Sequence, residues 1–299
     1  FRSADWADAL RGSVGAPVLC FDPAARDGTA YTVFRAALFR IAYVNYPRWR
    51  VGEAELLGEA AARAALGALR EIGVDVVNGP LDWVPPACRR GARVDTLIET
   101  SIDDLPAWSP QADAELRRVA RRVAKSGVEV VPATRGHARF AYERYRATMA
   151  RHGGSAKYPL AYFEAVLDLA ARADPVLRAR VALVGGELAA YLITGADDGT
   201  MHYLHGGLRL DLSSAHPTDA LFLDSIAAAR DAGYRRYDFM ASPADQPQLV
   251  RFKEKWGGTT RRREVASIPL RPLRARAFAA AKSAHAWLTR MRARASMKR

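Results

Sequence analysis

The chain has little cysteine: Cys20 and Cys88 are its only two, and they lie far apart in the sequence. Two distant cysteines do not form a disulfide framework, so a reducing compartment is the default. Apolar residues make up 49% and charged residues 26% of the 299 residues, which is ordinary globular usage. A chain of this length suits two domains of roughly 130–150 residues each.

Long apolar runs are also lacking. No run reaches the roughly 18–20 residues that a membrane span needs. The stretch 181–195 comes nearest, but Glu187 and two glycines interrupt it. The first ten residues carry Asp5 and Asp8 and lack the basic-then-apolar pattern of a signal peptide. We therefore expect a cytoplasmic protein.

The sequence shows no metal signature. Its six histidines, at positions 137, 152, 202, 205, 216 and 285, show no ligand spacing beside cysteines or acids. His202 and His205 are three residues apart in a segment that we expect to be a strand, and strand alternation would point them to opposite faces. We expect no bound metal.

Acidic residues are scarce at one end only. The formal net charge is +13, and residues 261–299 contain twelve Lys or Arg and a single acid, Glu264. That segment therefore carries +11, and the other 260 residues carry only +2. The basicity belongs to a C-terminal tail rather than to the body, which argues against a broad nucleic-acid footprint.

Three segments share one pattern of helix, glycine and short β-rich strand: 58–77, 112–131 and 218–239. Gly73, Gly127 and Gly233 stand where each helix should end, and glycine supplies the left-handed turn that such an end favours. Helices alternating with strands predict α/β layers. The first and third segments lie 160 residues apart, which hints at duplication of one unit.

A boundary is expected near residue 132. Beyond it, helices are predicted at 137–152 and 162–173, followed by an antiparallel meander. The meander has strands at 180–184, 187–194 and 200–205, with Gly185-Gly186 as a tight hairpin turn. We therefore predict one half at 1–132, a second at 133–270, and a helical tail at 271–299.

Three motifs in the second half carry a specific likeness: G-G-E-L-A-A at 185–190, G-Y-R-R-Y-D-F at 233–239, and L-V-R-F-K-E-K-W-G-G at 249–258. They resemble, in order and spacing, the FemAB-like branch of the GNAT superfamily and its BioF2-like acetyltransferase domain. A-Y-V-N-Y-P at 42–47 and the segment 96–105 fit the N-terminal half of such proteins more loosely.

The resemblance implies an α/β fold of two tandem GNAT-like halves with mixed central sheets. It also implies an acyltransferase that joins an acyl group to an amine, with its site in the second half. Members differ in the donor, which is acyl-CoA in some and aminoacyl-tRNA in others. The donor is a co-substrate, so no tightly bound cofactor is expected.

Amide formation needs an activated donor, a neutral amine and stabilisation of an oxyanion. No Ser/His/Asp-type pair is visible in the sequence, which favours direct transfer over an acyl-enzyme. Lys253 matches the lysine of the family's F-K pair and is the first catalytic candidate, with a plain surface lysine as the alternative. Phe252 would position it by packing. Trp256 and the following glycines are expected to form a structural turn into the last strand.

Asp238 ends a predicted strand and is a candidate proton acceptor, with a loop cap as the alternative. His205 precedes Gly206-Gly207 and titrates near neutral pH, so a base role competes with a structural one. Tyr203 and Tyr237 are candidate cleft residues, although tyrosine is also common in strands.

Ordinary GNAT proteins bind the CoA pyrophosphate with a glycine-rich loop before the helix that here begins near residue 218. In this chain the glycines are missing from 209–217, so the usual form of CoA binding is in doubt. Arg209, Ser213 and Ser214 are the candidate phosphate contacts, because hydroxyls and helix starts bind anions. In the first half, Tyr43 and Asn45 are candidate substrate contacts.

The tail predicts a final helix from 273 to 297. Apolar residues recur there at spacings of three or four, and arginines cover the rest. Three interpretations compete: a helix docked on the body, a helix on an anionic membrane face, and a contact for tRNA phosphates. A peripheral location at the inner membrane face, in cell-envelope metabolism, follows from the second.

The sequence thus favours an N-acyltransferase that moves an acyl group from acyl-CoA to an amine of a sugar, peptide or lipid-linked precursor. An aminoacyl-tRNA-dependent transferase acting on a cell-wall or secondary-metabolite precursor is the first alternative. A non-catalytic GNAT-like module that binds membrane or RNA is the second.

Overall fold

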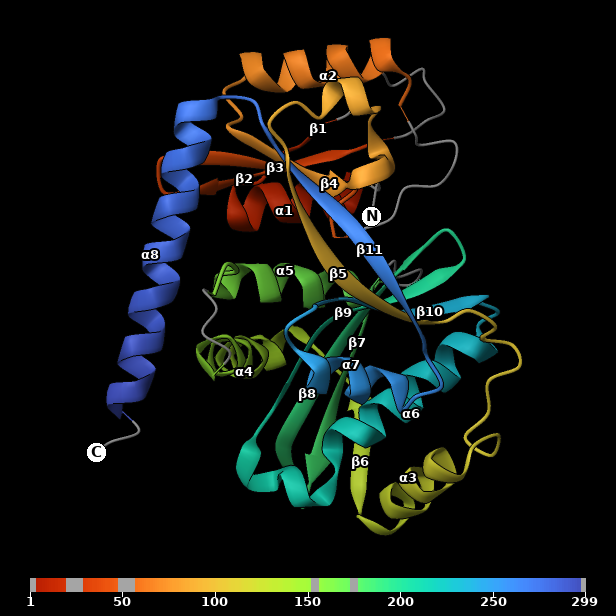
Figure 1. Cartoon of the computed structure of the whole chain (residues 1–299). Helices are drawn as coiled ribbons and strands as arrows, with labels where there is room; N and C mark the ends of the chain where they lie inside the picture. Colours follow the sequence, from red (N-terminus) through yellow and green to blue (C-terminus); the bar gives the residue numbers. More distant parts are fainter. Residues whose placement is uncertain (1–3, 20–28, 48–56, 152–155, 173–176, 297–299) are drawn as a thin grey trace. The chain divides into compact units, whose positions relative to one another are not determined.

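A computed structural model describes residues 4–19, 29–47, 57–151, 156–172 and 177–296 (Figure 1). The chain divides into two compact units. Unit 1 comprises residues 1–97, 151–155 and 263–299, and unit 2 comprises residues 98–150 and 156–262. Each unit is described separately below.

Unit 1 contains a mixed set of strands in the order β1-β2-β3-β4-β11. The β2/β3 hairpin is antiparallel, β3 and β4 are parallel, and β4 and β11 are antiparallel. Gly79 on β4 is required by packing, because an added Cβ would lie 2.7 Å from a methyl group of Val44. The bounds are α1 Ala4–Val14, β1 Val18–Leu19, β2 Tyr31–Ala36, β3 Phe39–Val44, α2 Glu59–Glu71, β4 Val76–Pro80, η2 Leu81–Trp83, η3 Pro86–Cys88 and β11 Thr259–Pro269.

The core of unit 1 gathers around Trp83, Tyr31 and the apolar face of α2, which includes Leu69. Helix α8, Pro272–Ser296, follows β11 and is the long blue helix of Figure 1. The sequence placed this helix at 273–297, and residue 297 lies outside the described residues. Cys88 is buried and free, whereas Cys20 falls outside the described ranges.

Unit 2 contains strands in the order β5-β10-β9-β8-β7-β6. Strands β6 to β9 are antiparallel neighbours, and β9 pairs with β10 in parallel. This mixed α/β arrangement confirms the predicted fold class. The bounds are β5 Arg93–Ile102, α3 Ala114–Lys125, β6 Val128–Pro132, η4 Arg135–His137, α4 Ala138–Arg151, α5 Leu160–Ala170, β7 Leu177–Val184, β8 Glu187–Asp197, β9 Thr200–Leu208, η5 Leu210–Ala215, α6 Pro217–Asp231, β10 Arg236–Pro243 and α7 Pro247–Glu254.

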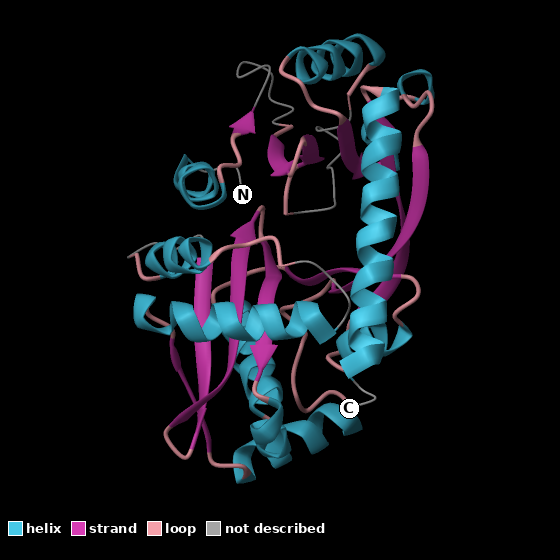
Figure 2. Ribbon diagram, turned by 90° about the vertical axis from the view of Figure 1, so that its left-hand side faces the viewer, coloured by secondary structure: helices cyan, strands magenta, loops and turns pink. Residues whose placement is uncertain are grey.

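Helices cover both faces of the strands of unit 2 (Figure 2). Helix α6 packs on β6, β7 and β8 and carries α3 beside it, whereas α5 packs on β7 and its Phe163 contacts Tyr191 of β8. The core on the α6 face gathers around Phe222, Phe239 and Trp256, which are almost fully buried. One face of the strands therefore packs on α6 and the other on α5. Which of the two helices surrounds a strand side chain depends on the face to which it points.

The three predicted helix–glycine–strand segments are confirmed as α2–β4, α3–β6 and α6–β10. Gly73, Gly127 and Gly233 have φ values of 87°, 66° and 82°, the left-handed conformation expected at these helix ends. Gly185 and Gly186 form the predicted turn between β7 and β8, with φ values of 57° and 84°. Local chemistry is sufficient to place these elements.

The division between units differs from the predicted boundary at residue 132. Residues 98–132 belong with unit 2, because β6 pairs with β7 and α3 packs on α6. Strands β5 and β11 each contribute residues to both units. The tail 271–299 is likewise part of unit 1 and not a separate segment. Duplication of one GNAT-like half stays a prediction.

Candidate functional site

The parallel strands β9 and β10 separate after a short pairing. Their register joins Thr200 to Arg236, Met201 to Tyr237, and His202 to Asp238. Strand β9 then continues to Leu208 and β10 to Pro243, with no further pair between them among the described residues. His202 and Asp238 thus stand at the point where the strands part and backbone groups become available.

Buried polar side chains concentrate around this point. Glu99, His202, Asp238 and Lys253 are each at most 4% exposed. Burial of such groups is costly unless charges and hydrogen bonds compensate it. A buried cluster of titratable side chains of this kind is therefore a candidate functional site, since such groups concentrate at functional sites.

Met240 links two of these residues through its backbone. It has a φ of 62°, a left-handed conformation that is uncommon for a residue with a Cβ. Its N–H donates to Asp238 Oδ1 at 2.8 Å, and its carbonyl oxygen accepts from Lys253 Nζ at 2.8 Å. Such a conformation costs about 1–3 kcal/mol. Asp238 and Lys253, the two side chains that the family likeness singled out, stabilise it by bonding the N–H and the carbonyl oxygen of Met240.

Lys253 is buried near the end of α7. Burial lowers its pKa to about 8 from an ordinary value of 10.5, and the charges of Asp238 and Glu99 oppose part of that shift. A pKa near 8 keeps most of the side chain cationic at neutral pH. It also allows a proton to leave far more readily than from an exposed lysine. The sequence alternative of a surface lysine is therefore wrong.

The lowered pKa predicts how stability depends on pH. Between pH 8 and 10.5 the unfolded chain binds the Lys253 proton and the native state does not, so stability rises with pH in that window. Below pH 8 both states bind it, and the full penalty of about 3 kcal/mol for the buried charge applies. We expect the stability of the parent relative to Lys253→Met, measured by denaturant unfolding, to increase between pH 8 and pH 10.5, because only the parent releases this proton in the native state. A pH-independent difference would contradict this assignment.

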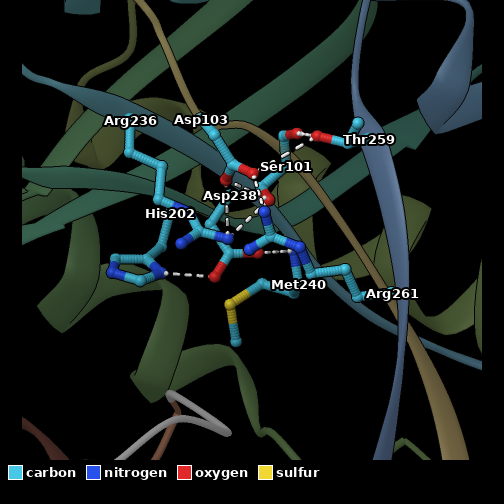
Figure 3. A network of polar contacts seen from close by, with 8 residues as sticks. All are labelled: Ser101, Asp103, His202, Arg236, Asp238, Met240, Thr259 and Arg261. Atoms are coloured by element: carbon cyan, nitrogen blue, oxygen red, sulfur yellow. Dashed lines mark hydrogen bonds and ion pairs between the residues drawn. The ribbon is translucent and has the colours of Figure 1, made fainter. Parts of the chain in front are cut away.

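Asp238 and His202 face one another, with His202 Nδ1 3.4 Å from Asp238 Oδ2 (Figure 3). Next to them, Asp103 lies between two arginines (Figure 3). Its Oδ1 is 3.0 Å from Arg236 Nη2, and its Oδ2 is 2.7 Å from Arg261 Nη2. This second network fixes the start of β10 against β5 and thereby the position of Asp238.

His205 and His202 lie on the same face of β9, so the predicted opposite orientation is wrong. The register with β8 shifts between Ile193 and Thr194, and Leu204 is the extra residue on β9. Such a bulge reverses the alternation of side chains beyond it. Tyr203, before the bulge residue, packs on Phe222 of α6.

His205 lies among aromatic side chains of α4 and α5. Its Nε2 is 2.8 Å from the hydroxyl of Tyr162, and Tyr145, Tyr158 and Phe163 surround the ring. Burial lowers the pKa of His205 to about 4. A group with this pKa is a weak base at neutral pH, so these contacts favour the structural alternative.

Tyr237 and Tyr203 belong to the face that packs on α6. The Tyr237 hydroxyl is 3.0 Å from Ser225 Oγ inside the core, and Tyr237 is fully buried. Burial raises the pKa of Tyr203 to about 12. An added Cβ on Gly206 would lie 2.7 Å from the Tyr203 hydroxyl oxygen, so the space at this glycine is filled by that side chain.

The segment before α6 replaces the glycine-rich loop with a 3-10 turn. Arg209 is held by carboxylates, at 2.8 Å from Glu187 Oε2 and 2.5 Å from Asp211 Oδ2. Ser213 Oγ donates to the carbonyl oxygen of Leu210 at 2.6 Å. Both contacts compete with the predicted binding of a phosphate. Ser214 lies in the same turn, η5.

Helix α6 itself begins at Pro217 after His216, whose φ is 60° and whose side chain makes no capping hydrogen bond. Helix geometry leaves the N–H groups of Thr218 and Asp219 without helical acceptors. Lys255 Nζ lies 2.6 Å from Asp219 Oδ1 and neutralises this carboxylate at the helix start. Peptide dipoles favour an anion there.

Phe252 and Trp256 anchor the segment that carries Lys253. Trp256 is fully buried and stacks on Phe222 at 5.3 Å between ring centroids, and Phe252 contacts the same ring edge-on. Gly257 has a φ of 85°, and an added Cβ on Gly258 would lie 2.7 Å from Thr100 Cγ2. The predicted structural turn before the last strand is confirmed.

Tyr43 and Asn45, the two candidates from the first half, belong to unit 1. Tyr43 packs on Phe34 and Tyr46. Asn45 has a φ of 50° and accepts the N–H of Ala30 through Oδ1 at 2.9 Å. This contact is that of a turn residue, and a role towards substrate stays a prediction.

Two members of the buried cluster were not recognised as site residues from the sequence. Glu99 is one of several polar residues of strand β5, RVDTLIETSI, so the sequence does not single it out. His202 was considered only as a metal ligand. Within the described ranges, no group of three or more His, Cys, Asp or Glu side chains could hold a metal ion.

Comparison with protein families matches residues 111–254 to the acetyltransferase (GNAT) domain. This segment begins just before α3, ends on α7 and includes both Asp238 and Lys253. The chain therefore contains a GNAT-type acetyltransferase domain, and acyl transfer is its supported general activity. The suspected family is confirmed at this level. No curated protein matches the chain.

Solved structures share the fold over most of the chain. The structure of FemX superposes with a TM-score of 0.59 at 15% identity, over 90% of this chain and 92% of that one. The C-terminal domain of a putative lysylphosphatidylglycerol synthetase from Agrobacterium fabrum gives 0.57 at 17% identity, over 89% and 87%. L-PGS from Bacillus licheniformis gives 0.55 at 12% identity, over 88% and 90%. Identities this low establish likeness of fold alone.

Proposed function

We propose that this chain is an N-acyltransferase that moves an acyl group from acyl-CoA to an amine of a sugar, peptide or lipid-linked precursor. The observation that carries the proposal is the pairing of Asp238 and Lys253 across the strained backbone of Met240. It lies where β9 and β10 part, inside the segment that matches the acetyltransferase domain.

The proposed chemistry is direct transfer. The neutral amine of the acceptor attacks the acyl carbonyl carbon, and the C–N bond forms as an oxyanion develops. The ammonium of Lys253 has three N–H donors, one of which bonds Met240, and stabilises the negative charge. Asp238 accepts the proton that the amine loses. The C–S bond then breaks, and the proton is returned to the CoA thiolate.

The proposed site for the CoA pyrophosphate is the start of α6. The open N–H groups of Thr218 and Asp219 can substitute for a glycine-rich loop, because they present donors at one helix end, and Lys255 neutralises the Asp219 carboxylate that would otherwise repel an anion there. Arg209 is not needed for this role, since Glu187 and Asp211 already neutralise it.

A basic face on α3 favours aminoacyl-tRNA as a second candidate donor. Helix α3 has the sequence AELRRVARRVAK, and its arginines are exposed while Leu116 and Val119 are buried. Exposed arginines on one face of a helix suit the phosphates of a nucleic acid. The two donors therefore predict different surfaces on unit 2, one at the start of α6 and one along α3.

Thermal unfolding with CoA, acetyl-CoA and an aminoacylated tRNA distinguishes the donors. We expect CoA to raise the melting temperature, since a ligand at 100 times its Kd stabilises by about 2.7 kcal/mol. Lys255→Gln should weaken that shift, because the uncompensated carboxylate of Asp219 would repel the pyrophosphate. The matched variant Arg118→Gln/Arg122→Gln on α3 should not affect it.

The opposite pattern supports the second donor: a shift with tRNA alone that the α3 variant abolishes. Stabilisation by none of the three compounds would contradict the transferase proposal and favour a non-catalytic module.

A further inference from the structure

Helix α8 docks on unit 1 through its first turns only, as far as its described side chains show. Arg274 Nε lies 2.6 Å from Oδ1 of the buried Asp75, and the Arg274 guanidinium sits over the ring of Phe39. Phe278 contacts the same ring with centroids 5.4 Å apart. The docked-helix interpretation is thus correct for the beginning of α8.

A different face of α8 carries exposed apolar side chains. Leu273 is 80% exposed, Trp287 57%, and Leu288 and Met291 47% each. At 3.6 residues per turn, these four fall within an arc of roughly 100°. The docking residue Phe278 lies roughly 135° from the centre of that arc. These four residues are called the α8 face below.

The α8 face is accompanied by positive charge without compensation in the helix. The sequence of α8 contains six Lys or Arg and no Asp or Glu. Arg276 and Lys282 are exposed, and at 3.6 residues per turn Arg276 lies roughly 70° from the centre of the α8 face and Lys282 roughly 170° from it. Another exposed apolar residue, Leu38 at 77%, lies at the start of α8, because Arg274 donates to its carbonyl oxygen.

We propose that the α8 face binds the surface of an anionic lipid bilayer, with the helix lying in the plane of the interface. A bilayer offers an apolar layer for Leu273, Trp287 and Met291 and a phosphate layer for Arg276 beside them. The stripe from Leu273 to Met291 spans about 27 Å at 1.5 Å per residue, a length that suits a flat surface. RNA offers phosphates but no apolar layer for aliphatic side chains.

The stripe between these residues is rich in alanine, so charge supplies much of the binding. We expect the full chain to sediment with vesicles of phosphatidylglycerol and phosphatidylcholine and not with phosphatidylcholine alone. Binding should fall steeply between about 0.1 M and 1 M salt, as the Debye length shortens from ~10 Å to ~3 Å. No described helix of the chain is long and apolar enough to cross a bilayer.

Two variants separate the contribution of positive charge to membrane binding from the contribution of apolar side chains. Arg276→Glu/Lys282→Glu should lower the partition coefficient at least about tenfold, chiefly through Arg276, which flanks the α8 face, given the strength of single cations at anionic surfaces. Leu273→Ser/Met291→Ser should also lower it while leaving the charge unchanged. The matched control Arg11→Glu/Arg63→Glu makes the same charge change on exposed residues of α1 and α2 in the same unit and should retain binding.

Absence of binding to anionic vesicles, or binding that neither α8 variant reduces, would overturn the proposal. So would binding of tRNA that persists at a salt concentration where vesicles are released and that depends on Arg276 and Lys282. The assay contains no acyl donor and no acceptor, so failure here leaves the transferase proposal untouched. Thermal unfolding of each variant confirms that the fold is retained.

Discussion

Lys253→Met is expected to lower turnover by about 10²–10³-fold, the usual cost of removing one donor that stabilises an oxyanion. The loss should fall on kcat more than on KM, because the charge develops only in the transition state. Steady-state kinetics with the donor that thermal unfolding identifies measures both parameters. The methionine fills a similar volume and leaves no buried ammonium, so the protein should remain folded.

The structure suggests a competing role for Lys253, since its ammonium also holds the carbonyl oxygen of Met240. If this backbone contact were its only role, Lys253→Arg would restore turnover whenever it restored the contact. If Lys253 instead stabilises the oxyanion from a fixed position, Lys253→Arg would restore turnover only in part. Unchanged kcat in a folded Lys253→Met protein would remove Lys253 from the mechanism.

The pH profile provides a second check on Lys253. Since the cation is the form that stabilises the oxyanion, kcat should decline as pH rises through about 8, where Lys253 loses its proton. The arginine variant keeps its charge and should lack that decline.

Many elements of the fold follow from local sequence. Gly127 and Gly233 end their helices as predicted, and Gly185-Gly186 turns β7 into β8, because each requires only the conformation of one or two residues. The F-K pair likewise led to Lys253 from a short motif. Local chemistry of this kind is present in the sequence itself and needs no knowledge of distant contacts.

The remaining features depend on register and on contacts between distant segments. The bulge at Leu204 reverses the alternation of β9 and brings His202 and His205 to one face, which no spacing rule indicates. Glu99 reaches the site only because β5 neighbours β10 in unit 2. The division between units is similarly non-local. Unit 1 begins at residue 1, and strand β11, most of which belongs to this unit, begins only at Thr259.

Asp238 combines a contact within its own strand with contacts to distant segments of the chain. Its Oδ1 caps the strained N–H of Met240, its Oδ2 faces His202, and its charge raises the pKa of Lys253 against the effect of burial. A structural carboxylate would need only the first of these contacts. A proton acceptor needs the negative charge. A substitution that keeps the bond to the Met240 N–H and removes the charge therefore distinguishes the two roles.

Asp238→Asn makes this change, because the amide oxygen can still accept the Met240 N–H while the charge is lost. We expect kcat to fall by about 10²–10⁴-fold, the usual contribution of general acid–base catalysis. Loss of the negative charge should also lower the pKa of Lys253 further below 8, so the alkaline decline of the remaining activity should move to lower pH. Rates measured from pH 6 to pH 10 report both effects.

The control is Asp224→Asn on α6, where a half-buried carboxylate pairs with Arg180 at 3.3 Å outside the site. It should reduce stability modestly and leave the pH profile in place. Because Asp238 and Lys253 would act on one transition state, the double variant Asp238→Asn/Lys253→Met should be little slower than the slower single variant. Additive losses would mean that the two residues act independently, and a normal rate for Asp238→Asn would leave Asp238 with its backbone contact alone.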